Sequence, residues 1–285
     1  MSRITQLLRF LRHNPRITTG FAILGCMLLL WVVGMATIGT SKAVPLSGPP
    51  DLEPSARYLL GTDSAGRQLL PVIIAGMPLT LEVGLLAGGV GLLIGALLGF
   101  TAGYFGGPLD TLIRTAADVM LPIPALAVLV VIASTIHTLL SVEVMALVVA
   151  SLAWMYPTRT IRSQVLSIRT RAYVEVGRFS GESHLDIIFG ELVPNLLPFL
   201  AASFVGAVGA GILAAIGLEA LGLGPQDKPT LGMTIFWAIY YGATLRGMWW
   251  WWGPPIVVLI LLFMALFSIA QGLDRYTNPR LRRAG

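Results

Sequence analysis

The stretch GLLAGGVGLLIGALLGFTAGYFGG, residues 84–107, contains no charged side chain and has a glycine at every fourth position from Gly91 to Gly107. About twenty apolar residues are enough for a helix to cross the hydrocarbon core of a bilayer. Glycines spaced by four lie on one helix face and let another backbone approach closely. The stretch therefore predicts a membrane-spanning helix with a glycine ridge, which serves either static packing or a contact that slides when the helices move. The ridge consists of Gly91, Gly95, Gly99, Gly103 and Gly107.

The composition of the whole chain is that of a membrane protein. Of its 285 residues, 55% are hydrophobic and 12% are charged, whereas a soluble protein carries about 25% charged residues. The basic residues flank apolar segments and form no single stripe, so the net charge of +5 does not indicate nucleic-acid binding. The single cysteine excludes a disulfide within the chain, and the three histidines lie too far apart in sequence to predict a metal site.

Six apolar segments are long enough to be membrane spans, which predicts an all-α polytopic membrane protein of about six transmembrane helices. The chain then divides into an N-terminal segment 1–19, a first transmembrane helix 20–40, a loop 41–77, a transmembrane domain 78–272 and a tail 273–285. The six predicted spans are 20–40, 78–104, 116–136, 142–158, 196–222 and 253–272.

The distribution of Lys and Arg predicts how these spans are oriented, because cytoplasmic loops are enriched in both residues. If the N-terminus is cytoplasmic, fourteen Lys and Arg residues fall inside and five fall outside. We therefore expect both termini and the loop 159–195 in the cytoplasm, and the loop 41–77 outside. The run Trp249–Trp252 then falls at the outer interface, where Trp side chains anchor helices. Stacking on a bound solute is the alternative for these tryptophans.

The loop 159–195 contains most of the polar stretch AYVEVGRFSGESHLDIIFGELVPNLLP, residues 172–198. The segment from Ser183 to Asp186 is a variant capping box that starts a helix, and Pro194 suits the start of the following span. A shorter helix before it would place Gly177 and Gly181 one turn apart, as a flat spot. On these helices Leu185, Ile188, Phe189 and Leu192 would share an apolar face, and Glu175, Arg178 and Glu182 could pair.

Such a pair of short helices has the pattern of a docking element for a partner protein, with apolar anchors and a charged rim. The apolar face could instead pack beneath the chain's own spans, and the pattern alone leaves both interpretations open. A hydrolytic enzyme is disfavoured, because Ser183 and His184 are adjacent and adjacent positions on a helix do not face each other.

The positions of the carboxylates in the apolar segments indicate which energy source could drive transport. Glu82, Asp118, Glu143 and Glu219 fall near the ends of the predicted spans, whereas ion-coupled carriers place ionisable groups near the bilayer midplane. The chain also contains no G-x-x-x-x-G-K-[ST] loop for ATP. Active transport would therefore draw its energy from another subunit, and a channel or secondary carrier remains the alternative.

The polar loop resembles the EAA motif of ABC importer permeases, in which Glu-Ala-Ala leads to a glycine and ends in Leu-Pro. Glu175 matches the glutamate, Gly181 the glycine and Pro194 the proline. The sequence departs from the motif at the two alanines, at the leucine and at one isoleucine, where Val176, Gly177, Val193 and Glu191 stand.

Three further segments are similar to the C-type permease subunit of the dipeptide/oligopeptide/nickel transporter family. They are LGTDSAGRQLL at residues 60–70, AGYFGGPLDTLIRTAADVMLPIP at 102–124 and LDRYTNPRLRR at 273–283. The resemblance implies one of two permease subunits of a heterodimer in a bacterial or archaeal cytoplasmic membrane. It also implies two ATPase subunits that bind ATP and Mg, and an external binding protein that delivers peptides or similar small solutes.

The resemblance also implies which residues of this chain have functional roles. There would be no catalytic residue, metal or cofactor on the chain itself. The residues 159–195 would form the loop that couples the permease to an ATPase, and the external binding protein would do most of the cargo selection. The coupling residues would be Glu175, Gly177, Arg178, Gly181, Glu182, Asp186, Phe189 and Pro194.

Overall fold

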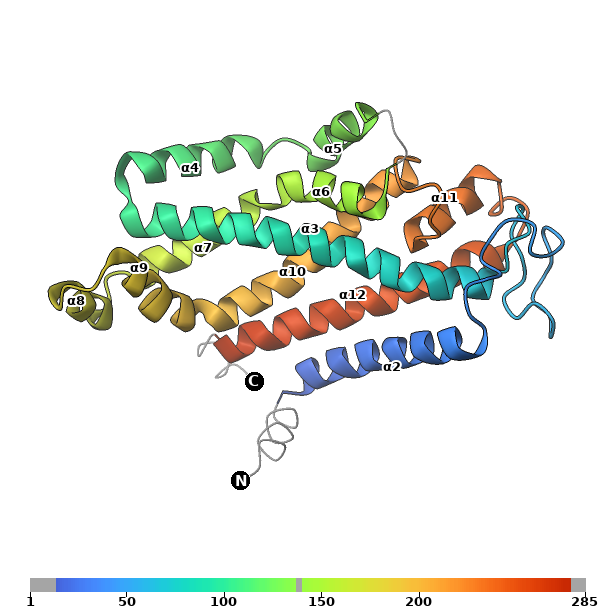
Figure 1. Ribbon diagram of the computed structural model, residues 1–285, viewed down its shortest axis with the longest axis horizontal. Helices are drawn as coiled ribbons and strands as arrows, with labels where there is room; N and C mark the ends of the chain where they lie inside the picture. Colours follow the sequence, from blue (N-terminus) through green and yellow to red (C-terminus); the bar gives the residue numbers. More distant parts are fainter. Residues whose placement is uncertain (1–13, 137–139, 278–285) are drawn as a thin grey trace, which may run out of the picture.

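The computed structural model describes residues 14–136 and 140–277, and within these ranges the regular elements are helices. Residues 1–13 and 278–285 of the predicted terminal segments lie outside the described residues. The long helices lie along one elongated bundle (Figure 1). The described helices, long and short, are α2 Pro15–Thr37, α3 Leu69–Phe105, α4 Gly107–Met120, α5 Ala125–Ser134, α6 Val142–Ala153, α7 Met155–Ile168, α8 Ala172–Phe179, α9 His184–Asp186, the π-helix η1 Ile187–Leu192, α10 Val193–Ala220, α11 Leu231–Tyr240 and α12 Trp249–Thr277.

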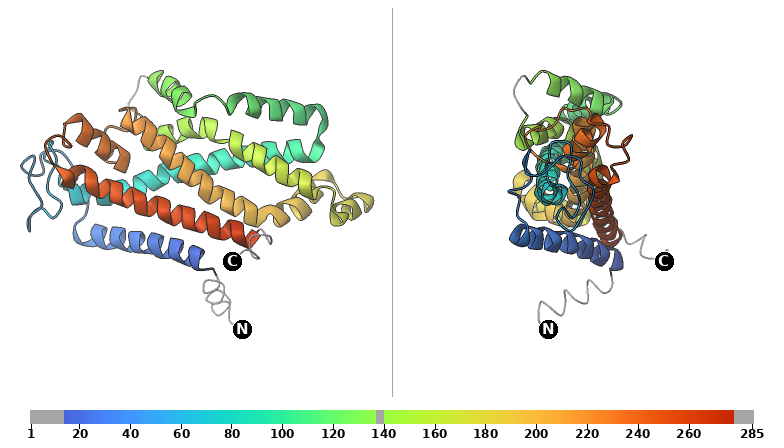
Figure 2. Two further views of the ribbon diagram at one scale, coloured as in Figure 1. Left: turned by 180° about the vertical axis from the view of Figure 1, so that it is seen from behind. Right: turned by 90° about the vertical axis from the view of Figure 1, so that its right-hand side faces the viewer.

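The described residues form four to six helical segments that are long and apolar enough to cross a membrane, which confirms the predicted all-α, polytopic fold class. Four continuous helical segments are long and apolar enough to cross a bilayer: Pro15–Thr37, Leu69–Phe105, His184–Ala220 and Trp249–Asp274. Two bent pairs, α4 with α5 and α6 with α7, each pass the same test when taken together. Figure 2 shows α2 and α4 on opposite sides of the bundle, with α3 between them.

Two of the predicted spans are broken in the structure. The span predicted at 116–136 begins earlier, at Gly107, and bends by 86° between α4 and α5. Pro122 and Pro124 lie in this break, where their rings cannot donate backbone hydrogen bonds to continue a helix. The span predicted at 142–158 bends by 45° between α6 and α7 and stays helical to Ile168. Pro157 cannot donate to the carbonyl of Ala153, which weakens the helix at this bend.

Two predicted loops are accordingly shorter than expected. Helix α3 begins at Leu69 with Pro78 in its interior, so the last nine positions of the loop predicted at 41–77 are helical. Glu82 consequently lies well inside α3 and not near a helix end. Similarly, the loop predicted at 159–195 is helical as far as Ile168 and resumes a helix at Ala172.

Helix α3 is the central element because glycines on two of its faces let other helices approach. A Cβ atom added to Gly88 would lie 2.5 Å from the backbone nitrogen of Val208 on α10. One added to Gly84 would lie 2.3 Å from the Ile212 side chain, also on α10. In membranes, where the hydrophobic effect does not drive helices together, such close backbone packing is a main source of association.

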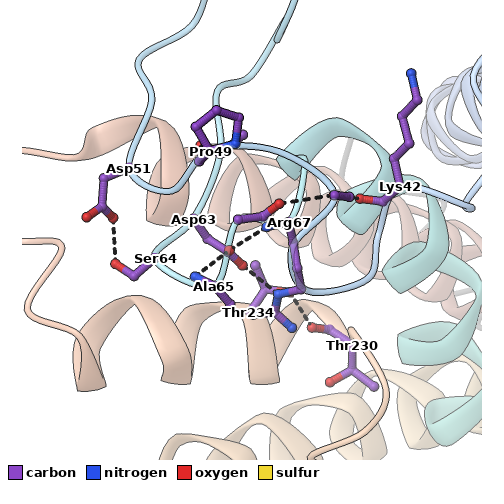
Figure 3. A network of polar contacts seen from close by, with 12 residues as sticks. Lys42, Pro49, Asp51, Asp63, Ser64, Ala65, Arg67, Thr230 and Thr234 are labelled. Atoms are coloured by element: carbon purple, nitrogen blue, oxygen red, sulfur yellow. Dashed lines mark hydrogen bonds and ion pairs between the residues drawn. The ribbon is translucent and has the colours of Figure 1, made fainter.

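The loop before α3 contains a network of polar contacts (Figure 3), and an ion pair of Asp51 with Arg246 joins this loop to the linker between α11 and α12. The fully buried Asp63 carboxylate accepts hydrogen bonds from the backbone nitrogens of Ala65 and Arg67, at 2.9 and 2.8 Å. It also pairs with the Arg67 side chain at 2.5 Å. Asp51 accepts a hydrogen bond from Ser64 at 2.6 Å and pairs with Arg246 of the α11–α12 linker.

The tryptophan run at the start of α12 is packed largely inside the protein, in contrast to the expected interfacial anchor. Trp251 is fully buried and Trp250 is 6% exposed, whereas Trp249 is 57% exposed. The Trp251 ring stacks on Tyr241 with 6.0 Å between centroids. The Trp250 ring covers Gly61, where an added Cβ would lie 2.8 Å from it. These two rings therefore hold the loop before α3 and the end of α11 in place.

The Asp51–Arg246 contact predicts that the loop before α3 opens in a pH-dependent manner. Burial raises the pKa of the Asp51 carboxyl. The hydrogen bonds from Arg246 and Ser64, together with the positive charge of Arg246, outweigh this effect and lower the pKa below its ordinary value. The contribution to stability is thus present above the unfolded-state pKa and is lost as the pH falls through the lower folded-state pKa. We expect Asp51→Asn to raise amide exchange across residues 46–66 at pH 7 by up to about fivefold.

Amide exchange of the wild type, corrected for its intrinsic pH dependence, should rise to the level of the variant only under acidic conditions. Arg57→Gln in the same loop, which leaves the Asp51–Arg246 pair intact, is the control. Equal exchange of wild type and Asp51→Asn at pH 7 would show that this ion pair does not hold the loop.

Candidate functional site

Helix α8 ends in a turn that requires glycine at position 181. The backbone N–H of Gly181 donates to the carbonyl of Arg178, and that of Glu182 donates to the carbonyl of Gly177. These two bonds form a Schellman motif, which places the residue after the C-cap in the left-handed region. Gly181 has φ +80°, and a Cβ atom added there would meet nothing within 4 Å. The turn thus depends on the backbone conformation of Gly181 and not on a crowded neighbour.

The next helix begins with the capping box expected from the sequence. The Ser183 hydroxyl accepts a hydrogen bond from the backbone nitrogen of Asp186 at 3.2 Å. The Asp186 carboxylate accepts in return from the backbone nitrogen of Ser183 at 3.3 Å and from its hydroxyl at 2.6 Å. Only four residues therefore separate the end of α8 from the start of α9, and both ends are fixed by local hydrogen bonds.

A π-helix divides the apolar face that was expected on residues 185–192. The backbone nitrogen of Val193 donates to the carbonyl of Ile188, five residues earlier, beside Pro194, which has no N–H. Ile187, Ile188 and Leu192 are buried against α3 and α7. Leu185 and Phe189, in contrast, are 64% and 63% exposed. The expectation of a single face was wrong because the wider π-turn changes the 3.6-residue period.

Contacts with the end of α3 hold the two short helices in place. The Tyr104 hydroxyl lies 3.0 Å from Nδ1 of His184, the first residue of α9. The guanidinium of Arg178 lies over the Tyr104 ring, 5.3 Å from its centroid, and Phe105 packs edge-on against His184. Sequence reasoning did not assign His184 a positioning role, because its partner is eighty positions away in the chain.

The predicted charged rim does not pair internally. Among the described residues, Glu175, Arg178 and Glu182 form no ion pair with one another. The Glu182 carboxylate instead covers Gly177, where an added Cβ would lie 2.9 Å from Oε2. Gly177 is therefore buried and forms no flat spot with Gly181. Glu175 is exposed on the first turn of α8.

Helix α7 connects this loop to the glycines of α3. A Cβ atom added at Gly91, Gly95, Gly99 or Gly103 would lie 2.5–2.9 Å from atoms of Ala153 or α7. Gly107 does not share this contact, since it opens α4 and an added Cβ there would meet nothing within 4 Å. The glycines Gly84 and Gly88, whose spacing is equally visible in the sequence, pack on α10 instead.

Arg162 of α7 and Arg169, its C-cap residue, fasten the C-terminal half of this helix. Arg162 forms a bidentate ion pair with Asp110 of α4, and the Arg169 side chain donates to the carbonyl of Gly103 at 2.9 Å. Bidentate Arg–carboxylate pairs fix orientation as well as distance. Movement of the short helices would therefore be passed to α3, α4 and α7 as one unit.

An exposed apolar patch remains on the two short helices, on the side away from the bundle core. Phe179 is 90% exposed, and Val176, Leu185 and Phe189 are each more than 60% exposed. The exposed charged residues Glu175, Arg178, Glu182 and Asp186 lie among these side chains in the sequence, which is unfavourable for a surface that faces lipid. We call Val176, Phe179, Leu185 and Phe189 the docking patch. A rimmed apolar patch of this kind marks a protein contact.

These features define a polytopic membrane protein with two short helices packed at one end of its bundle (Figure 1). The model of the family described as binding-protein-dependent transport system inner membrane component matches residues 91–283, and the chain belongs to this family. The matched range includes the docking patch and all five glycines of the ridge. The protein is thus a permease subunit of an ATP-driven ABC importer, and the channel or secondary-carrier alternative is set aside.

Individual relatives agree with this assignment. The dipeptide transport system permease protein DppC of Bacillus subtilis is 30% identical over 92% of this chain and 82% of its own length. The oligopeptide permease OppC of Mycobacterium tuberculosis is 30% identical over 76% of this chain and 75% of its own. The glutathione permease GsiD of Pectobacterium atrosepticum is 26% identical over 76% and 72%. A chain of the inward-facing MetNI methionine ABC transporter shares the fold, with TM-score 0.59, 20% identity and coverage of 74% of this chain and 98% of that one.

Proposed function

We propose that this permease forms one half of a heterodimeric pathway for peptides or similar small solutes, and that its docking patch is the contact through which a partner ATPase drives transport. In this assignment two ATPase subunits hold ATP and Mg, and an external binding protein delivers the cargo. The peptide class is supported by relatives that are described as dipeptide and oligopeptide permeases. The glutathione relative indicates that cargo differs within the family.

The docking patch is the observation that carries this proposal. Its apolar side chains are exposed at a position surrounded by charge, so burial against a partner would remove them from water. Each fully buried aromatic side chain of this kind contributes about 1.5–3 kcal/mol. Glu175 has no ion-pair partner among the described residues and lies beside Val176, so it can meet a cationic group of the ATPase.

The contact loop would transmit force because its buried face packs on two of the long helices. Ile187, Ile188 and Leu192 belong to a buried cluster with Phe100 and Tyr104 of α3 and with Val165 of α7. A displacement of the docking patch would therefore move α3 and α7 together. The ridge of Gly91, Gly95, Gly99 and Gly103 would then serve as a close contact that keeps these two helices in register.

The division between exposed and buried side chains gives a test of this proposal. Phe179→Ser and Phe189→Ser should lower the recovery of ATPase subunits with the purified permease, and lower ATP-driven uptake, while the permease itself unfolds at the wild-type temperature. Ile188→Ala should destabilise the permease by about 2–5 kcal/mol, because it opens a cavity in the core under η1.

Complex recovery, thermal unfolding and uptake would be measured for each variant in lipid nanodiscs. Leu185→Gln provides a milder exposed substitution, and Leu245→Gln in the linker between α11 and α12 provides an exposed control outside the spans. Full recovery of ATPase subunits in the Phe179→Ser/Phe189→Ser double variant would argue that another surface makes the contact.

The proposed orientation places both termini and the docking patch in the cytoplasm. It rests on the fourteen-to-five distribution of Lys and Arg. With Cys26→Ser as background, Glu182→Cys should react only with membrane-permeant maleimides in intact cells. Lys228→Cys, between α10 and α11, should also react with impermeant reagents. The opposite pattern would invert the orientation and with it the assignment of the docking patch.

A further inference from the structure

A cavity of about 410 Å³ lies where the two broken spans meet the middle of α10. One wall is the break between α4 and α5, with Leu121 and Ile123, and a second wall is the bend between α6 and α7, with Met155 and Tyr156. The third wall is a row of small residues on α10 that includes Gly206 and Ala210. The volume is within the range of about 300–1,000 Å³ that is typical of small-molecule sites.

The chemistry of the lining restricts what can enter. Of the described residues that line the cavity, Tyr156, Thr160 and Ser203 have polar side chains and none is charged. The Thr160 hydroxyl already donates to the carbonyls of Tyr156 or Pro157, at 3.1 and 3.2 Å. A charged group would therefore lose its hydration without finding a partner, which is strongly unfavourable. An apolar group has no hydrogen bonds to water to give up, so its entry into the cavity carries no such penalty.

The position of the cavity indicates that its occupant is part of the transported solute. Breaks in spanning helices are tolerated at membrane depth only where protein or a cavity covers the irregular backbone. Here two separate breaks, at Leu121–Pro124 and at Trp154, border the same space. Transporters commonly build their substrate sites from discontinuous helices of this kind.

We propose that this cavity receives the apolar side chain of a peptide-like cargo during translocation, so that the permease selects cargo by side-chain size in addition to the selection made by the binding protein. This inference rests on the proposed function. It concerns the transmembrane pathway and not the contact with the ATPase, so the two can fail separately.

Gly206 offers a substitution that fills the cavity without disturbing its neighbours. A Cβ atom added at Gly206 meets nothing within 4 Å, and the residue lies in the interior of α10 with ordinary helical backbone angles. Gly25 on α2 has the same open surroundings and lies outside the cavity lining. Gly206→Leu and Gly25→Leu therefore form a matched pair.

The test measures uptake of radiolabelled Ala-Phe and Ala-Ala by the complete transporter in proteoliposomes, with the binding protein present. Gly206→Leu should lower the uptake of Ala-Phe relative to Ala-Ala by roughly tenfold, the range expected for steric exclusion of an apolar group. Gly25→Leu should leave the ratio unchanged. Because the binding protein is the same in every preparation, a changed ratio must arise in the permease.

A second measurement detects occupancy of the cavity by its effect on the labelling rate of a cysteine at position 206. With Cys26→Ser as background, Gly206→Cys in the complete transporter should react with N-ethylmaleimide more slowly in the presence of Ala-Phe than of Ala-Ala. An unchanged uptake ratio together with equal labelling rates would overturn the proposal and favour lipid chains as the occupant. Uptake of both dipeptides by the wild type that is independent of ATP would instead overturn the proposed function.

Discussion

Gly181→Val is expected to abolish most of the cargo-stimulated ATP hydrolysis and uptake while leaving the protein inserted in the membrane. Gly181 has φ +80° and closes the Schellman turn between α8 and α9. A β-branched residue held in the left-handed region costs about 1–3 kcal/mol, which corresponds to roughly 5–150-fold in the population of the native turn. Insertion should be normal, because no atom lies within 4 Å of the new Cβ and no span is touched.

The conservative variant Gly181→Asn separates backbone conformation from side-chain bulk. Asn tolerates the left-handed region better than most residues with a side chain and so should keep much of the coupling. Glu175→Ala should lower coupling in the same direction as Gly181→Val but less strongly, by removing the exposed charge on α8. Near-normal ATP hydrolysis and uptake in both Gly181→Val and Glu175→Ala would reject the docking assignment.

Gly95→Leu is expected to prevent accumulation of the assembled permease. A Cβ atom at Gly95 would lie 2.6 Å from the Cβ of Pro157 and 2.8 Å from the carbonyl oxygen of Trp154. These are rigid backbone or ring atoms, so α3 and α7 would have to separate where they now touch. Overpacking of a fixed contact typically costs about 1–3 kcal/mol or more, and here it falls beside the bend between α6 and α7.

Leu97→Ile is the matched control, because Leu97 lies two positions away on the exposed side of α3. Fluorescence-detected size-exclusion chromatography would report the yield of folded protein and of complex. Gly95→Leu with wild-type yield and wild-type uptake would show that the ridge tolerates separation of the two helices, and the role proposed for α3 and α7 in force transmission would then be wrong.

The sequence predicted the elements that local chemistry determines. The capping box at Ser183 follows from hydrogen bonds within four residues, and the four glycines from Gly91 to Gly103 follow from helical spacing. Gly107 was included in the ridge by spacing alone, but Gly106 at φ +71° ends the helix before it. Helical spacing carries no information about where a helix stops.

Features that depend on distant contacts could not be predicted in the same way. The π-turn at Ile187–Leu192 exchanges Ile187 for Phe189 on the buried face, because burial against Phe100 and Val165 decides which side chains turn inward. Trp250 and Trp251 belong to a residue type that is common at lipid interfaces, yet α11 and the loop before α3 cover them. Hydropathy alone does not distinguish a lipid-facing tryptophan from one that is covered by its own chain.

The most direct test of the central claim is photo-cross-linking from position 179 in the purified complex of both permeases and both ATPases in lipid. A photoreactive phenylalanine analogue replacing Phe179, which is 90% exposed in the docking patch, is compared with the same analogue at Leu245, which is 96% exposed. Leu245 belongs to the linker between α11 and α12, and this linker lies at the end of the bundle opposite to α8 (Figure 1). We predict cross-links to an ATPase subunit from position 179 and none from position 245, with mass spectrometry identifying the partner. Cross-links from position 179 to lipid or to the external binding protein, with none to an ATPase, would contradict the account.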